Sequence, residues 1–501
     1  MQIPKSLKVY DSLLACAVGF YAIYEIYTSY SGIGISPDSI MYASTAQNIA
    51  QHGNLLTFNG GPIVFFPIFY PVFLSIILFI TQVNTVAAAP VINSILFCGV
   101  IFMSGLIVTK FKTYSGIYKW LILIAVVLSP ALLEIYTYLW SETLFIFITL
   151  VFILAFWNYQ QKRTLRSLII AAIVAAFGCL TRYAGVTLVG AGSLLLLLDN
   201  QLIIRQKIKY VLTFGLIGIS LLVGNLILNR LTSGLSTGTR ESSLTSLSKN
   251  LYYFGTVMCD WIGFPQTFYP CAILIACIIL FSLTGLLAWR AYKGKINTAE
   301  SVIICFAVVY GWFIPVFASI SRFEPLNSRL LSPLFVPLLI GITCWAPGMF
   351  KGRKLKTQLL FAIPFVAIML FSDYSLVMTD YQRWYDENDY GVPGYTDDDW
   401  NKSQFIMFLK THKDIYTLDI PKYTDADEAT YFFAGTTATL LPHKYFQNTV
   451  KQFFTVKHYY LIWFSSLNNW ELIGLPDILK HGTLKKLYGF PDGAVYEYTG
   501  K

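Results

Sequence analysis

The sequence predicts a polytopic α-helical membrane protein with a small C-terminal α/β domain. Of its 501 residues, 55% are hydrophobic and 13% are charged, with a mean hydropathy of +0.58, whereas a soluble protein has about 25% charged residues. The apolar residues form blocks of about 18 residues or more, which is the length that crosses a bilayer. Of the 27 acidic residues, 16 follow position 378. We therefore expect a membrane domain at 1–378 and an extracytoplasmic domain at 379–501.

The first apolar block, 11–29, predicts a membrane anchor. It follows Lys5 and Lys8 and has no small-residue cleavage site, which separates it from a signal peptide. Basic flanks favour the cytoplasmic side, so we expect a cytoplasmic N-terminus. Residues 31–62 contain no Lys or Arg, as is typical of an extracytoplasmic loop.

The distribution of basic residues predicts about eleven spans. After the anchor, the blocks are 86–108, 118–133, 143–158, 168–181, 185–198, 209–229, 267–289, 299–320, 330–349 and 357–378. The basic clusters between them are Lys110/Lys112/Lys119, Lys162/Arg163/Arg166, Arg205/Lys207/Lys209, Arg290/Lys293/Lys295 and Lys351/Arg353/Lys354/Lys356. Each cluster follows an even-numbered span, so all of them can be cytoplasmic together.

That agreement requires that the apolar stretch 65–82 does not cross the membrane, because one more crossing would move every later basic cluster outside. Pro67 and Pro71 interrupt its start, and each removes a backbone hydrogen-bond donor. We therefore predict that the first external loop, 31–85, carries interfacial helices.

The tail after the last span has a different composition. It opens with an acidic, turn-rich run at 386–399 and continues with a helix-like stretch at 400–411 and short apolar runs such as 458–464. This alternation predicts a small α/β domain.

Two carboxylates at predicted outer membrane edges are candidate catalytic residues. Asp38 follows Ser36-Pro37 and Glu142 follows Ser141, both of which resemble helix starts. A carboxylate at the edge of a low-dielectric region can act as a general base. The alternatives are that Asp38 only caps its helix and that Glu142 only complements a helix dipole.

Three arginines on the same predicted side are candidate phosphate contacts. Arg182 and Arg329 lie at the edges of apolar blocks, and Arg240 lies in the hydroxyl-rich loop STGTRESS. A guanidinium favours a bidentate oxyanion partner such as phosphate. The alternative is that the first two extend toward lipid headgroups. Tyr42 and His52, in the same segment as Asp38, are further substrate-binding candidates.

Several other chemistries lack their motifs. The sequence has no GK[ST] of a P-loop and no HExxH, and its scattered cysteines have no metal-ligand spacing. The excess basic charge belongs to short loops between apolar blocks, which suits lipid headgroups and membrane topology rather than nucleic acid.

These features together resemble the GT-C superfamily of lipid-linked glycosyltransferases, in particular bacterial proteins similar to protein O-mannosyltransferases and aminoarabinose transferases. The resemblance rests on PDSIMYASTAQNIAQHGNL, FFPIFYPVFLS, SETLF, LTRYAG and SRLLSPLFVPLL, in that order. It implies that Asp38 is the catalytic base, that Glu142 is the second acidic residue, and that Arg182 and Arg329 contact phosphate. The family usually has a second acid after the first, but Ser39 stands here, so a divalent metal ion is only a possibility.

The resemblance also implies the reaction and the partners. The expected activity is inverting transfer of a hexosyl or pentosyl unit from a polyprenyl-phosphate donor to a protein, lipid or glycan acceptor. The expected location is the plasma membrane of a bacterium (its inner membrane), with the reaction on the extracytoplasmic face. The alternatives are a transporter or flippase for lipid-linked sugars and a membrane assembly protein without catalysis.

Overall fold

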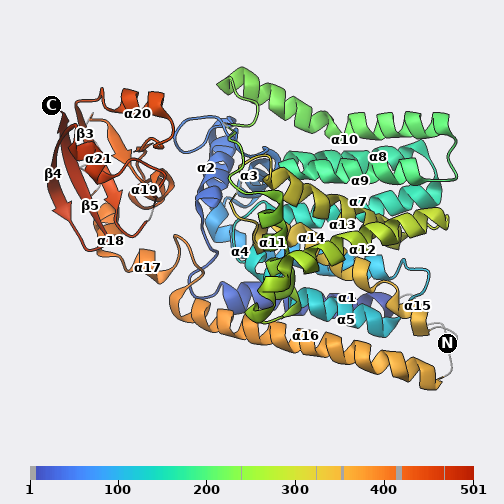
Figure 1. Ribbon diagram of the computed structural model, residues 1–501. Coiled ribbons are helices and arrows are strands. Elements are labelled where there is room, and N and C mark those ends of the chain that lie inside the picture. Colours follow the sequence, from blue (N-terminus) through green and yellow to red (C-terminus); the bar gives the residue numbers. More distant parts are fainter. Residues whose placement is uncertain are drawn as a thin grey trace.

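The protein consists of a helix bundle with a small mixed domain at one end (Figure 1). The computed structural model describes residues 7–238, 240–322, 324–350, 355–412, 420–467 and 469–500. Helices α2 (Pro37–His52) and α3 (Phe69–Thr81) lie at the end of the bundle that faces the C-terminal domain (Figure 1). The predicted fold class, a polytopic helical membrane protein with a C-terminal α/β domain, is confirmed.

Seven helices in the described ranges are long and apolar enough to cross a membrane. They are α1 (Leu7–Tyr21) with its π-helical continuation η1 (Ala22–Tyr27), α4 (Thr85–Val108), α7 (Glu142–Lys162), α10 (Ile204–Ser233), α12 (Ala272–Tyr292) with the preceding turn η3 (Gln266–Cys271), α13 (Ala299–Ala318), and α14 (Ser328–Thr343) with the segment after it. The shorter apolar helices α8 (Leu165–Thr181) and α9 (Val186–Leu198), and the 36-residue α16 (Leu355–Tyr390), fall on three further predicted spans.

The span predicted at 118–133 is not one straight helix. It consists of α5 (Gly116–Val127) and α6 (Pro130–Tyr136), whose axes differ by 51°. Ser129 ends the break and caps α6, and Pro130 occupies the first turn of α6, where its missing N–H costs nothing. Counted as one broken span, this pair raises the number of candidate spans to eight.

The stretch 65–82 forms a helix that is too short to span. Helix α3 has 13 residues, or about 20 Å at 1.5 Å per residue, against about 30 Å of hydrocarbon. It packs on α2, with the rings of Tyr42 and Tyr70 5.0 Å apart. The prediction of interfacial helices in the first external loop agrees with these dimensions.

The basic residues Lys162 and Arg163 and the candidate catalytic residue Glu142 lie at opposite ends of one helix, whereas Lys351, Arg353 and Lys354 lie outside the described residues. Helix α7 begins at Glu142 and ends at Lys162, 21 residues later, which separates its two ends by about 30 Å. This is the separation that the distribution of basic residues predicts.

The C-terminal domain has one five-stranded sheet in the order β2-β1-β3-β5-β4. Its strands are β1 (Lys422–Thr424), β2 (Thr439–Leu440), β3 (His458–Phe464), β4 (Gly482–Gly489) and β5 (Gly493–Gly500), and its helices are α17 (Asp398–Asn401), α18 (Gln404–Thr411), α19 (Asp427–Ala434), α20 (Gln447–Phe453) and α21 (Leu475–Leu479). Strand β1 pairs in parallel with β2 and β3, while β5 pairs antiparallel with β3 and β4. The run predicted at 458–464 is β3.

The acidic run at 386–399, predicted to be rich in turns, begins as a helix. Helix α16 continues to Tyr390, so Asp386, Glu387 and Asp389 belong to its last turns and the helix passes through the domain boundary predicted at 378. An ion pair between Arg383 and Glu387, 2.6 Å long, links successive turns there and supports the helix.

The carboxyl group of Asp380 lies buried beside this ion pair. Neither of its oxygens has a hydrogen-bond partner in the described part of the chain. Burial raises the pKa of Asp380 to about 8, with the guanidinium of Arg383 opposing the shift and Glu387 adding to it. Because the folded state holds this proton more tightly than the unfolded state, the contribution of Asp380 to stability falls as the pH rises from about 4 to about 8.

We therefore expect Asp380→Asn to raise the apparent unfolding midpoint by a few degrees at about pH 9, where the native carboxylate is charged. The difference should shrink as the pH falls and be nearly absent at about pH 4, near the pKa of the carboxyl in the unfolded state. Thermal unfolding of detergent-solubilised protein measures this, with Asp389→Asn on the exposed end of the same helix as the control. An equal shift at both pH values would contradict the assignment.

Candidate active site

A short backbone pairing brings the starts of α2 and α7 together. The Gly34 N–H donates to the Thr137 carbonyl at 2.8 Å, and the Leu139 N–H donates to the Gly34 carbonyl at 3.2 Å. A β-carbon at position 34 would lie 2.6–2.7 Å from the side chains of Val392 and Tyr138. Only glycine therefore allows this pairing, which places the residues after 35 beside those after 139.

Both candidate carboxylates lie in the first turn of a helix. Helix α2 starts with the Ser36 N–H donating to the Ser39 hydroxyl at 3.0 Å and with Pro37 in its first turn, so Asp38 follows directly. Glu142 is the first residue of α7. The predicted helix starts are confirmed, and the positive ends of both helix dipoles face the carboxylates.

Four of the predicted site residues form one ion-pair network. Arg329 Nη2 lies 2.5 Å from Asp38 Oδ2, and Arg329 Nε lies 2.7 Å from Glu142 Oε1. Arg182 Nη1 lies 2.6 Å from Glu142 Oε2 and also donates to the Ser141 hydroxyl at 2.9 Å. The starts of α2, α7 and α14 and the end of α8 thus meet at two carboxylates and two guanidinium groups.

The two carboxylates have different environments. The Glu142 side chain is fully buried, and each of its oxygens faces a guanidinium. The Asp38 side chain is 29% exposed, and within the described residues its second oxygen, Oδ1, accepts no hydrogen bond. Glu142 is therefore fully engaged by protein groups, whereas Asp38 retains one oxygen for an incoming molecule.

The ring of Trp140 packs against the guanidinium of Arg329. The Arg329 guanidinium lies 4.1 Å from the centre of the Trp140 ring, a cation–π distance, and the Trp140 Nε1–H donates to the Ser36 hydroxyl at 2.8 Å. Sequence reasoning missed Trp140. The available signal was an aromatic residue at a predicted membrane edge, where Trp is enriched.

Tyr42 lies beside the network. Its hydroxyl is 3.1 Å from the Ser141 hydroxyl, and the side chain is buried. Burial raises the pKa of Tyr42 well above its usual value, and the charges of Asp38 and Glu142 add to the effect. The phenol therefore stays protonated and is available as a hydrogen-bond donor.

A cavity of about 480 Å³ opens next to Arg182. Its polar lining includes Ser141, Arg182 and Arg240. Its walls are mostly apolar and come from Phe65, Phe66, Pro67, Ala184, Val186, Leu222, Phe313, Ile314, Phe317 and Leu330. We refer to it as the cationic cavity.

The turn between α8 and α9 shapes this cavity. Arg182 has an extended backbone and η2 (Tyr183–Gly185) follows it. A β-carbon at Gly185 would collide with the backbone of Gly178, so the tight turn requires glycine. Arg240 reaches the cavity from the loop after α10, where its guanidinium lies 5.6 Å from the centre of the Tyr183 ring.

Arg329 lies with the candidate carboxylates, whereas His52 lies apart from them. Arg329 faces the two carboxylates and does not line the cationic cavity. His52 is the last residue of α2 and is exposed, about 21 Å along the helix from Asp38. Asp38 and His52 lie 14 positions apart on the same helix. Because no turn interrupts this helix, His52 stays away from the network.

A metal site is not evident in the network. In the described ranges, no group of three or more His, Cys, Asp or Glu side chains has the arrangement to hold a metal ion. The position between the two carboxylates is held by the Arg329 guanidinium instead.

Comparison with known proteins gives structural matches only. No family model and no curated protein matches the sequence. The structure matches ArnT from Cupriavidus metallidurans bound to undecaprenyl phosphate with a TM-score of 0.57 and 11% identity over 99% of this chain and 98% of that one. It matches the archaeal oligosaccharyltransferase AglB from Archaeoglobus fulgidus, in complex with an inhibitory peptide and a dolichol-phosphate, with a TM-score of 0.55 and 10% identity over 99% of this chain and 74% of that one. The GT-C fold that the sequence predicts is confirmed.

The network predicts unequal effects of two arginine substitutions on stability. Arg329→Ala leaves a fully buried carboxylate with one partner and Asp38 with none, which should destabilise the protein by about 3–5 kcal/mol. Arg240→Ala removes an exposed guanidinium and should change stability by less than about 0.5 kcal/mol. Unfolding midpoints in detergent measure both, and similar midpoints for the two variants would refute the structural role of Arg329.

Proposed function

We propose that the protein is an inverting glycosyltransferase that moves a sugar from a polyprenyl-phosphate donor to an acceptor hydroxyl at the extracytoplasmic membrane face. The observation that carries this proposal is the position of Asp38. It is a carboxylate with one unengaged oxygen, and Arg329 and Glu142 connect it to the rim of the cationic cavity. The GT-C fold, shared with proteins solved with undecaprenyl phosphate and dolichol-phosphate, supports the same reading.

The sidedness follows from charge. The basic cluster at Lys162 and Arg163 lies about 30 Å from the network along α7, and basic loops favour the cytoplasm. The network and the C-terminal domain would then be extracytoplasmic and the N-terminus cytoplasmic, in the plasma membrane of a bacterium.

The cationic cavity has the chemistry that a lipid phosphate requires. Arg182 and Arg240 provide guanidinium groups for the phosphate oxygens, and the apolar walls of α13 and the segment before α3 suit an isoprenoid chain. A mainly apolar cavity with a few convergent charged groups is typical of a ligand site. A hexosyl or pentosyl unit on the phosphate would extend from the guanidinium groups toward Asp38.

The reaction is one displacement at the anomeric carbon. The acceptor oxygen forms a bond to that carbon while the bond from the carbon to the phosphate oxygen breaks, and the phosphate leaves with the electron pair. The proton of the acceptor hydroxyl passes to Asp38 Oδ1 as general base. Arg182 and Arg240 stabilise the charge that develops on the leaving phosphate. Attack from the side opposite the phosphate inverts the anomeric carbon.

The other residues of the network act through Asp38. Arg329 holds Oδ2 of Asp38 and thereby directs Oδ1 toward the open side. Glu142 balances the charge of Arg329 and Arg182, so that neither guanidinium is buried without a counter-ion. Arg329 and Glu142 are positioning residues in this mechanism.

A transporter without catalysis is the alternative. Secondary transporters bind substrate near the middle of the membrane, at helices that are broken there. Here the paired charges gather at the helix ends, where α2, α7 and α14 begin. This arrangement favours surface chemistry over transport.

The base assignment predicts that Asp38→Asn reduces sugar transfer by about 10²–10⁴-fold while folding and lipid binding persist, because the amide oxygen can still accept from Arg329. Mass spectrometry of the lipid that copurifies with the protein first identifies the donor. Release of polyprenyl phosphate from that donor then measures transfer. Asp389→Asn, an exposed acid of α16, is the matched control. Unreduced transfer by the Asp38 variant would reject the base.

The donor assignment is tested at Arg240, because Arg182 also neutralises Glu142 and its removal would perturb folding. Arg240→Ala should weaken binding of undecaprenyl phosphate by about tenfold or more, the effect of losing a hydrogen bond to a charged group. Arg230→Ala, an exposed arginine at the last turn of α10, should leave binding unchanged. Equal affinities for the two variants would exclude Arg240 from the donor site.

A further inference from the structure

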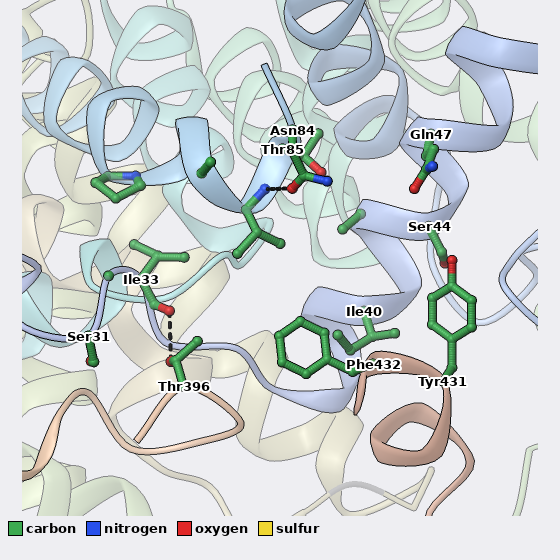
Figure 2. Close-up of a pocket in the computed structure, with 15 residues that line it drawn as sticks. Ser31, Ile33, Ile40, Ser44, Gln47, Asn84, Thr85, Thr396, Tyr431 and Phe432 are labelled. Carbon is green, nitrogen blue, oxygen red and sulfur yellow. Dashed lines mark hydrogen bonds between the residues drawn. The ribbon is translucent and has the colours of Figure 1, made fainter. Parts of the chain in front are cut away.

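A second cavity, of about 500 Å³, lies where α2, the start of α4 and the tail helix α19 meet (Figure 2). It shares none of its lining residues with the cationic cavity. We refer to it as the neutral cavity, because none of the described residues that line it is charged.

The neutral cavity and the reaction centre lie on opposite sides of α2. The cavity is lined by Ile40, Ser44 and Gln47. Successive members of this set are four and three positions apart, which places them on one face of the helix. Asp38 and Tyr42, which belong to the network side, point away from that face at 100° per residue. The distance across the helix is about 10 Å, so a molecule in the neutral cavity does not itself contact Asp38.

The cavity has unused hydrogen-bonding groups. Within the described residues, the amide of Gln47 has no hydrogen-bond partner. The oxygen of the Asn84 side chain accepts from the Val86 N–H at 2.9 Å, while its NH₂ group makes no protein contact of this kind in the same ranges. Asn84 is exposed and Gln47 is half-buried, so both amide groups reach solvent and can exchange water for the hydroxyl groups of a ligand.

Aromatic rings lie opposite these amides. Figure 2 shows Asn84 and Gln47 on one side of the cavity and Phe432 and Tyr431 of α19 on the other. The Tyr431 ring is stacked on Phe58 at 4.9 Å, which fixes α19 against the first loop. The Thr396 hydroxyl also donates to the Ile33 carbonyl at 2.9 Å, so both halves of the cavity are held together.

We propose that the neutral cavity binds an uncharged carbohydrate, namely the part of an acceptor glycan that lies away from the reacting hydroxyl. That this carbohydrate belongs to the acceptor rests on the proposed function. A neutral sugar offers hydroxyl groups to primary amides and an apolar face to aromatic rings. A phosphate or a carboxylate would find no cation in this cavity. A lipid chain would leave both amides unpaired. The C-terminal domain, which supplies α19, therefore contributes to acceptor recognition.

The test uses the full chain in lipid nanodiscs and neutral trisaccharides of glucose, galactose, mannose and N-acetylglucosamine. Saturation-transfer NMR measures binding of each trisaccharide to the wild-type protein. Gln47→Leu and Phe432→Ala should each weaken binding of the best trisaccharide by about tenfold or more. Gln452→Leu, the same change at an exposed position on α20, is the matched control and should bind like the wild type.

The outcomes separate this proposal from the proposed function. Asp38→Asn should bind the trisaccharide normally even though it transfers sugar about 10²–10⁴-fold more slowly. Binding of no trisaccharide, binding of detergent or lipid chains alone, or equal binding by the Gln47 and Gln452 variants would each overturn the carbohydrate site. If binding behaves as expected but Asp38→Asn transfers sugar at the wild-type rate, the carbohydrate site stands and the transferase mechanism fails.

Discussion

The burial of Glu142 is the constraint on which this end of the molecule depends. An ionised carboxylate removed from water costs several kcal/mol unless charged partners compensate it. Its side chain is fully buried, and Arg182 and Arg329 each engage one oxygen. The end of α8 and the start of α14 must therefore meet at the start of α7. The remaining donors of Arg329 then fix Asp38, and with it the orientation of α2.

The network also gives the arginines at this site different roles. Two carboxylates and two guanidinium groups balance in charge, so Arg329 is already neutralised by Asp38 and Glu142. A phosphate gains little from a guanidinium that two carboxylates already hold. In the proposed function, the phosphate therefore binds Arg240, which has no acidic partner among the described residues, and the free donors of Arg182. Two arginines that look equivalent in sequence thus differ because of what surrounds them.

Much of the membrane architecture could be predicted because it depends on charge placement along the chain. The basic clusters required 65–82 to be non-spanning, and α3 has only 13 residues. The features that were missed depend on contacts between distant residues. Trp140 supports Arg329 only because Gly34 pairs with the segment before α7, about a hundred positions away. His52 appeared close to Asp38 in sequence, but a straight helix separates them. The bend at Ser129 and the extension of α16 through the acidic run likewise depend on packing rather than on local propensity.

Helix α2 explains why one protein has two cavities of opposite character. An anionic lipid phosphate requires cations and a dry apolar wall, whereas an uncharged sugar requires hydrogen-bonding amides and aromatic faces, and one cavity that served both would bind each poorly. The helix presents Asp38 and Tyr42 on one side and Ser44 and Gln47 on the other. Its position is fixed at the start by Trp140 and Arg329 and along its length by α3 and α19. A single helix therefore separates the two cavities by about its own width and carries Asp38 on the side of the ion-pair network.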